Sequence, residues 1–118
     1  MSSFGISSLQ VASYVTACYS LRRHVVDPKG VLKPIIYFQT QKQPILTAVA
    51  QSFVLQAMHR QAVAWFMDPA LDPHVRHAIA TVDKVATVQA AQAANLVLGD
   101  RCGAQGLFDA NQLSSMHV

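Results

Sequence analysis

The sequence predicts an all-α protein, an antiparallel bundle of three long helices followed by a short C-terminal helix. Long stretches repeat their apolar residues at helical spacing, and turns that contain proline or glycine separate these stretches. We expect no β-strand, because no stretch shows the alternation of apolar and polar residues typical of one. Short connections favour antiparallel neighbours. The 118 residues suffice for a single domain, which we place at residues 1–118.

The first helix is expected over residues 3–24. Its larger apolar residues form one stripe, made of Leu9, Val11, Tyr14, Val15, Cys18 and Leu21. The opposite face carries small hydroxyl side chains at Ser7, Ser13, Thr16 and Ser20. Small side chains allow another helix to approach closely, whereas a face in water usually carries Lys or Glu. Residues 27–30 (Asp-Pro-Lys-Gly) then predict a turn.

The second helix is expected to begin near Pro34 and to end near Met67. Pro44 lies within this stretch and lacks the N–H for a helical hydrogen bond, so we expect either a kink there or a helix that begins at Pro44. Two apolar stripes follow, and they predict neighbours on two sides. The first contains Leu46, Val49, Phe53 and Ala57, and the second contains Val54, Met58, Ala62, Trp65 and Phe66.

The third helix is expected to begin at Asp72 and Pro73, an N-cap residue followed by a proline suited to the first turn. Its apolar stripe contains Val75, Ile79, Val82, Ala86, Ala90, Ala93 and Val97. Residues 85–99 contain no charge on any side, which favours a central position with neighbours all round. Residues 109–118 are expected to begin the short fourth helix, with Asn111 as its cap.

The composition indicates a surface that other protein covers. Apolar residues make up 52% of the chain and charged residues 13%, about half the usual share of charge. A small domain in isolation needs more charge to cover its large surface, so we expect either identical subunits or the remainder of a larger chain as partner. The net charge of +3 is scattered along the sequence, which argues against nucleic acid as a partner. No membrane span is expected, because no apolar run reaches about 18 residues.

The cysteines and the N-terminal sequence favour an intracellular protein. Cys18 and Cys102 lie in unrelated contexts and are expected to be reduced. Residues 1–21 lack the basic start of a secretory signal. We therefore expect a cytoplasmic location, with the peroxisome as the alternative in a eukaryote.

Few residues suggest chemistry of their own. The chain contains no glutamate, and its aspartates are too sparse to predict a paired-carboxylate site. His74 and His77 are three residues apart, but no carboxylate stands at a suitable spacing, so no metal site is expected. No residue is assigned a catalytic role.

The most unusual stretch is residues 100–108, where a charged pair and two glycines interrupt the alanine-rich third helix. Gly103 and Gly106 permit backbone conformations and close approaches that a side chain would forbid. The stretch is compatible with a helix stop and with a turn whose backbone meets a ligand. Both alternatives remain open from the sequence.

Three segments, in this order and spacing, resemble the C-terminal helical domain of acyl-CoA oxidases and acyl-CoA dehydrogenases. They are YSLRR at 19–23, PIIYFQTQ at 34–41 and CGAQG at 102–106. The first two segments are more similar to the oxidase branch. The resemblance extends over nearly the whole chain, and it implies the incomplete C-terminal domain of a larger flavoenzyme.

The resemblance also implies a cofactor and a set of contacts to it. In that family the domain packs against another subunit and contacts FAD. Arg22 matches an arginine that contacts the FAD pyrophosphate, and Gln39 matches a glutamine at a helix start near the same cofactor. The turn of Gly103, Ala104, Gln105 and Gly106 matches a turn that lets the backbone approach FAD. An Arg fork suits pyrophosphate oxygens on chemical grounds as well.

The activity implied for the parent enzyme is α,β-dehydrogenation of acyl-CoA to trans-2-enoyl-CoA. Members of the family remove the α-proton with a glutamate, and they have two further domains that complete the flavin and acyl-CoA sites. This chain contains no glutamate, so we expect the isolated chain to be inactive. The alternative is a non-enzymatic helical module that mediates oligomerisation.

Overall fold

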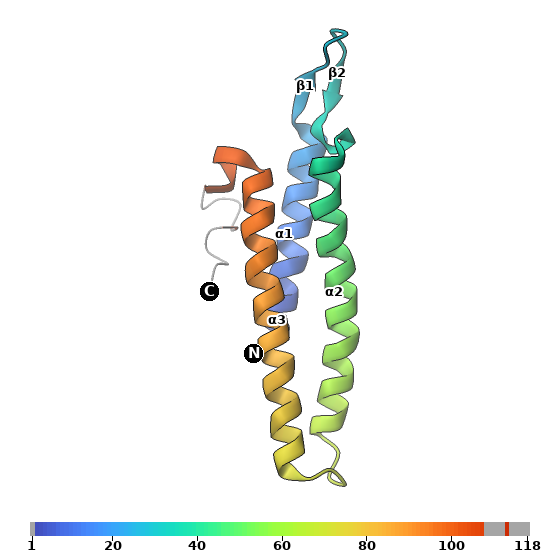
Figure 1. Cartoon of the computed structure of the whole chain (residues 1–118), viewed down its shortest axis with the longest axis vertical. Coiled ribbons are helices and arrows are strands. Elements are labelled where there is room, and N and C mark those ends of the chain that lie inside the picture. The colour runs from blue at the N-terminus through green and yellow to red at the C-terminus, as the bar shows by residue number, and fades with distance from the viewer. Residues whose placement is uncertain (1, 108–112, 114–118) are drawn as a thin grey trace.

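Three long helices lie side by side in the computed structural model, which describes residues 2–107 and Leu113 (Figure 1). Every pair of these helices is in contact, and the middle helix in sequence runs opposite to the other two. This arrangement confirms the all-α prediction at the level of a three-helix bundle. The elements in chain order are α1 (Ser2–Arg22), β1 (His24–Val26), β2 (Leu32–Pro34), η1 (Ile35–Tyr37), α2 (Gln39–Phe66), α3 (Pro73–Arg101) and η2 (Gly103–Leu107).

The bundle has a three-helix part and a two-helix part because α1 is shorter than its neighbours. Near the start of α1, Gly5 packs against Thr87, which lies in the middle of α3. Beyond that level α2 and α3 continue together to the turn that joins them (Figure 1). We call residues 58–84 the two-helix part. The opposite end, made of residues 21–42 and 100–107, is called the hairpin end.

The faces that meet inside the bundle combine many small or polar residues with a few leucines and isoleucines. A side-chain carbon on Gly5 would collide with the Thr87 side chain, so α1 and α3 are closely packed at this level. Small side chains permit this short separation, as expected for the hydroxyl face of α1. The buried residues of α1 include Ser8, Leu9, Ala12, Ser13, Thr16 and Ser20; those of α2 are Gln41, Ile45, Ala48, Ser52, Leu55 and Ala62; those of α3 are Asp83, Thr87, Ala91, Ala94, Asn95 and Leu98.

The larger apolar stripes predicted from the sequence turn largely outward. Tyr14 on α1 is 71% exposed, Phe53 on α2 is 68% exposed and Val82 on α3 is 64% exposed. The expectation that α3 is surrounded is also not met by this chain, since Val85 and Leu96 are exposed. Helical spacing alone does not say which face turns inward, and here close packing selects the small residues.

Two short strands contradict the prediction that the chain has no β-structure. β1 and β2 pair antiparallel, with His24 opposite Pro34 and Val26 opposite Leu32. Each strand has three residues, too few to show an alternation in the sequence. The predicted turn at residues 27–30 connects them, and Gly30 has φ +80° there. The first helix consequently ends at Arg22, two residues before the predicted end.

The start of α2 also differs from its prediction. The helix begins at Gln39, so neither Pro34 nor Pro44 is its first residue. Pro34 ends β2, and a 3-10 turn and the extended Phe38 precede the helix. Pro44 fits inside α2 because it lies close to the N-terminus, where few helical hydrogen bonds have yet been made.

The start of α3 is confirmed. The Asp72 side chain accepts a hydrogen bond of 2.8 Å from the His74 backbone N–H, and Pro73 is the first helical residue. A capped, proline-initiated start is encoded locally, which explains why the sequence was sufficient to find it. The fourth helix predicted at residues 109–118 lies outside the described residues.

Candidate functional site

The hairpin end gathers one terminus from each long helix. α1 ends there, α2 begins there and α3 ends there in η2 (Figure 1). Arg22, Gln39 and residues 103–106 are therefore at the same end of the molecule, although 81 positions separate the first from the last of these segments in the sequence. This common end is the candidate site.

Gln41 links the three helices at this end. Its side-chain Nε2 donates to the Ser20 Oγ on α1 at 2.8 Å and to the Arg101 carbonyl oxygen on α3 at 2.9 Å. Ser20 in turn donates to the Thr16 carbonyl oxygen at 2.8 Å. Gln41 is buried, whereas Gln39 is exposed on the first turn of α2. The sequence alone does not distinguish Gln41, because Gln39, Gln41 and Gln43 look equivalent until the rotation of the helix is known.

The glycines of η2 have roles within the chain itself. Gly103 has φ +61°, the left-handed conformation that commonly ends a helix. Gly106 is buried, and a side-chain carbon on it would overlap the carbonyl oxygen of Gly99. The reading of this stretch as a helix stop is thus confirmed. Space remains around the Gly103 Cα, where a side-chain carbon would meet no atom within 4 Å.

Two open grooves flank η2 and divide the predicted cofactor residues between them. A groove of about 540 Å³ lies between α1 and η2, and both Arg22 and Gln105 line it, together with Tyr14, Tyr19 and Arg23. Gly103, Ala104 and Gly106 instead line a groove of about 300 Å³ on the other side, beside Leu96 and Leu113. Gln39 belongs to the lining of neither groove.

Cys102 forms part of the floor of the groove between α1 and η2. Burial raises the pKa of its thiol, and this effect exceeds the opposing effect of the hydrogen bond from Sγ to the Thr16 Oγ1 at 3.7 Å. A neutral, buried thiol is a poor nucleophile. Cys102 therefore has the environment of a packing residue, and Cys18, which lines the same groove, is half-buried and free.

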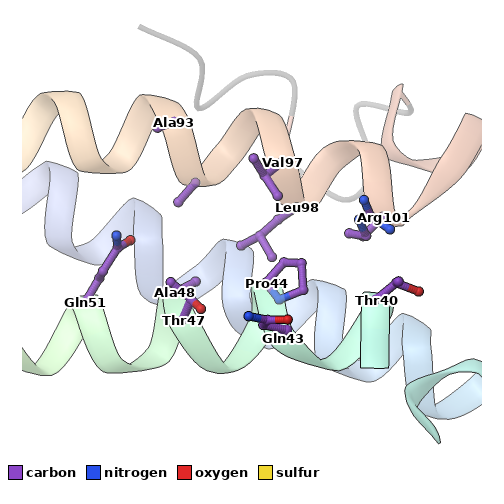
Figure 2. A pocket seen from close by; sticks show the side chains of 11 residues that line it. Thr40, Gln43, Pro44, Thr47, Ala48, Gln51, Ala93, Val97, Leu98 and Arg101 are labelled. Atoms are coloured by element: carbon purple, nitrogen blue, oxygen red, sulfur yellow. The ribbon is translucent and has the colours of Figure 1, made fainter. Parts of the chain in front are cut away.

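A further groove of about 390 Å³ runs between α2 and α3 at the same end (Figure 2). Pro44 and Leu98 point toward one another and form its apolar floor, and Arg101 lies at one end of it. Thr40 and Gln43 add polar groups on the α2 side. The mixture of one cation, amides and an apolar floor gives this groove no distinct chemistry of its own.

The two-helix part contains one buried polar pair. The His59 Nδ1 lies 2.8 Å from the Asp83 Oδ2, and Asp83 is buried. Asp83 also borders an apolar groove of about 450 Å³, lined by Met58, Trp65, Ile79 and Val82 among others. Within residues 2–107 and at 113, no three His, Cys, Asp or Glu side chains form a group that could hold a metal ion. No helix in the described part of the chain is long and apolar enough to cross a membrane.

Comparison with known proteins found no match for this chain among protein-family models, curated proteins or solved structures.

Proposed function

We propose that this chain is the cofactor-contacting and subunit-interface segment of an acyl-CoA oxidase- or dehydrogenase-like flavoenzyme. The observation that carries the proposal is the convergence of Arg22, Gln39 and residues 103–106 at the hairpin end. The resemblance requires these three segments to lie at one end of the bundle, and a bundle of different topology would separate them. The proposal includes a cytoplasmic location, with the peroxisome as the alternative in a eukaryote. It covers both the oxidase and the dehydrogenase branch of the family.

The groove between α1 and η2 fits the pyrophosphate of a flavin nucleotide. Arg22 and Arg23 bring two cations to it, and Tyr14 and Tyr19 bring aromatic surfaces. A guanidinium binds phosphate oxygens through two parallel hydrogen bonds, and Gln105 offers an amide on the opposite wall. Arg22 and Gln105 would therefore hold the phosphates, while Gly103 and Ala104 stand on the far side of η2.

Gln39 has a weaker part in this arrangement. It is exposed on the first turn of α2, where free backbone N–H groups and the helix dipole favour an anion. It would contact a nucleotide only beyond the rim of the groove between α1 and η2. Gln41 keeps the three helix ends in register behind it.

The chemistry of the parent enzyme would come mainly from outside this chain. In the family that the sequence resembles, FAD accepts the β-hydride of the acyl-CoA. A glutamate takes the α-proton there, and this sequence has none. The residues described above bind and orient, and none of them is assigned a proton transfer.

The outward apolar stripes support the interface role. Tyr14, Phe53 and Val82 are each more than 60% exposed and lie on three different helices. Side chains of this kind on every face are typical of surfaces that another protein covers. Identical subunits and the remaining domains of a parent enzyme would both supply such cover.

A titration of the intact chain with FAD, followed by flavin fluorescence, tests the proposal. We expect weak, saturable binding that Arg22→Gln reduces several-fold, because one of the two cations of the groove is lost. Arg60→Gln, in the two-helix part, is the matched control and should bind like the wild type. Absence of binding, or equal losses in both variants, would contradict the proposal. Added acyl-CoA should give no enoyl-CoA, and measurable turnover would show that these 118 residues themselves supply a base.

The second candidate is a non-enzymatic oligomerisation module. The apolar groove of the two-helix part, which contains Trp65 and Val82, favours it because the lining is mostly apolar and its carboxylate, Asp83, already contacts His59. Light scattering should then detect oligomers, and Trp65→Ser with Val82→Ser should dissociate them without changing the response to FAD. Oligomers together with no response to FAD would favour this module over the flavoenzyme segment.

A further inference from the structure

The β1–β2 hairpin projects beyond the ends of the helices (Figure 1). Val26 and Leu32 form the last strand pair before the turn, and they are 64% and 63% exposed. Val31, in the turn itself, is exposed as well. The narrow protrusion therefore carries a small apolar surface directly behind its turn, in which residues 27–30 are Asp, Pro, Lys and Gly.

The hairpin end also accounts for the whole net positive charge of the described chain. Six cations stand against two carboxylates there, a net charge of +4, whereas the two-helix part has three of each and no net charge. Asp27 and Lys33 form an ion pair, with the Asp27 Oδ2 2.8 Å from the Lys33 Nζ, which leaves five cations and one carboxylate outside it. The cations of the hairpin end are Arg22, Arg23, Lys29, Lys33, Lys42 and Arg101, and its carboxylates are Asp27 and Asp100.

We propose that the hairpin docks this chain onto an anionic lipid surface. Cations attract the headgroups, and apolar side chains that project among the cations enter the boundary between headgroups and acyl chains. The charge of the hairpin end is complementary to such a surface, and the Val26–Leu32 pair stands where insertion would occur. Attachment of this kind is peripheral and requires no membrane-spanning helix.

A lipid surface accounts for the hairpin better than a nucleic acid or an acidic protein segment does. A polyanion would pair with the cations but would leave Val26 and Leu32 in water at the tip. The proposal does not rest on flavin binding, since Gln105 and the groove between α1 and η2 lie behind the hairpin, on the bundle itself.

Co-sedimentation of the full chain with lipid vesicles tests this inference without any nucleotide. We expect binding to vesicles of phosphatidylcholine with phosphatidylserine, little binding to phosphatidylcholine alone, and weakening by salt. Val26→Ser with Leu32→Ser should weaken binding by about tenfold, because apolar area is lost at the tip. Met67→Ser with Val63→Ser is the matched control, because these residues of the neutral two-helix part are 71% and 47% exposed and line none of the grooves described above. The control should bind like the wild type.

A second pair of variants keeps the test valid if the serine substitutions disturb the hairpin. Arg23→Gln with Lys29→Gln removes two exposed cations and should weaken binding by about tenfold or more, whereas Arg60→Gln with Lys84→Gln should not. Equal binding to both vesicle types, or equal losses in the control variants, would overturn the proposal. So would tighter binding of single-stranded DNA or of an acidic peptide than of phosphatidylserine vesicles. The vesicle result is interpreted independently of FAD binding, so a change in FAD affinity in these variants would not alter the conclusion about lipid.

Discussion

The hairpin end and the two-helix part both expose apolar side chains, yet they differ in packing and in charge. At the hairpin end three helices meet, and Gln41 ties them together through Ser20 and Arg101. In the two-helix part α2 and α3 have only each other within the described chain, and the pair of His59 and Asp83 is the less exposed of their polar contacts. The net charge of +4 lies at the first end and none at the second. Exposed apolar side chains alone therefore do not distinguish a ligand-binding surface from a protein interface. The net charge of the residues around them does distinguish the two.

The largest expected effect is a difference in unfolding free energy between core substitutions at the hairpin end and substitutions in the two-helix part. Leu98 is fully buried where all three helices meet, so Leu98→Ala should lower the free energy of unfolding by about 3 kcal/mol. Val82→Ala in the two-helix part should cost less than about 1 kcal/mol, because that side chain is mostly exposed. Chemical denaturation followed by circular dichroism measures both. Equal costs would mean that α1 does not complete a core at the hairpin end.

The next effect concerns the polar link between the helices. Gln41→Ala removes two buried hydrogen bonds and should cost about 2 kcal/mol of unfolding free energy. Gln39→Ala, two positions earlier and exposed, should change it by less than about 0.5 kcal/mol. The same denaturation experiment compares them. If Gln39→Ala cost more than Gln41→Ala, the rotation assigned to α2 would be wrong.

These two glutamines show what the sequence could and could not predict. The helical class, the Asp72–Pro73 start of α3 and the turn at residues 27–30 follow from local chemistry, and the sequence was sufficient for them. The inward face of each helix depends on how closely the axes approach, which is a property of the whole bundle. For that reason helical spacing predicts the apolar stripes but not whether each stripe faces the core or the surface. It also does not show that Gln41, rather than Gln39, makes the contacts inside the bundle.

The hairpin could not be predicted from the sequence, whereas the candidate site could be predicted in part. Strands of three residues have no periodicity to detect, so β1 and β2 could not be predicted. A common site for Arg22, Gln39 and residues 103–106 was implied by the resemblance alone, and the three segments do lie at one end of the bundle. The separation of Gln105 from Gly103 and Ala104 could not be predicted, because it depends on how η2 turns.

A pair of glycine substitutions tests how α3 ends, and the expected changes in unfolding free energy are smaller. Gly103→Ala should cost about 1 kcal/mol of unfolding free energy, because φ +61° is unfavourable for alanine. Gly99→Ala should instead stabilise by up to about 1 kcal/mol, since Gly99 is helical and a side-chain carbon there meets no atom within 4 Å. Thermal unfolding of both variants gives opposite shifts in Tm if this account holds. Shifts of the same sign would contradict the helix stop.

The smallest expected effect is local to the hairpin. The hydrogen bond from Lys33 lowers the pKa of Asp27 below its ordinary value. The ion pair therefore stabilises the hairpin above the ordinary carboxyl pKa, and this contribution is lost as the pH falls through the lowered one. Amide NMR signals of Asp27 and Val31 should change below about pH 4, with a midpoint that Lys33→Met raises. An unchanged midpoint in that variant would show that the pair does not persist in solution.

The central claim is that the hairpin end of this chain binds the flavin nucleotide and the two-helix part does not. An NMR titration of the labelled full chain with FAD tests it most directly, because amide shifts report weak binding residue by residue. Saturable shifts are expected at Arg22, Cys102 and Gln105, and none at Arg60 or Arg76. Shifts centred on the two-helix part, or no shifts at all, would contradict it.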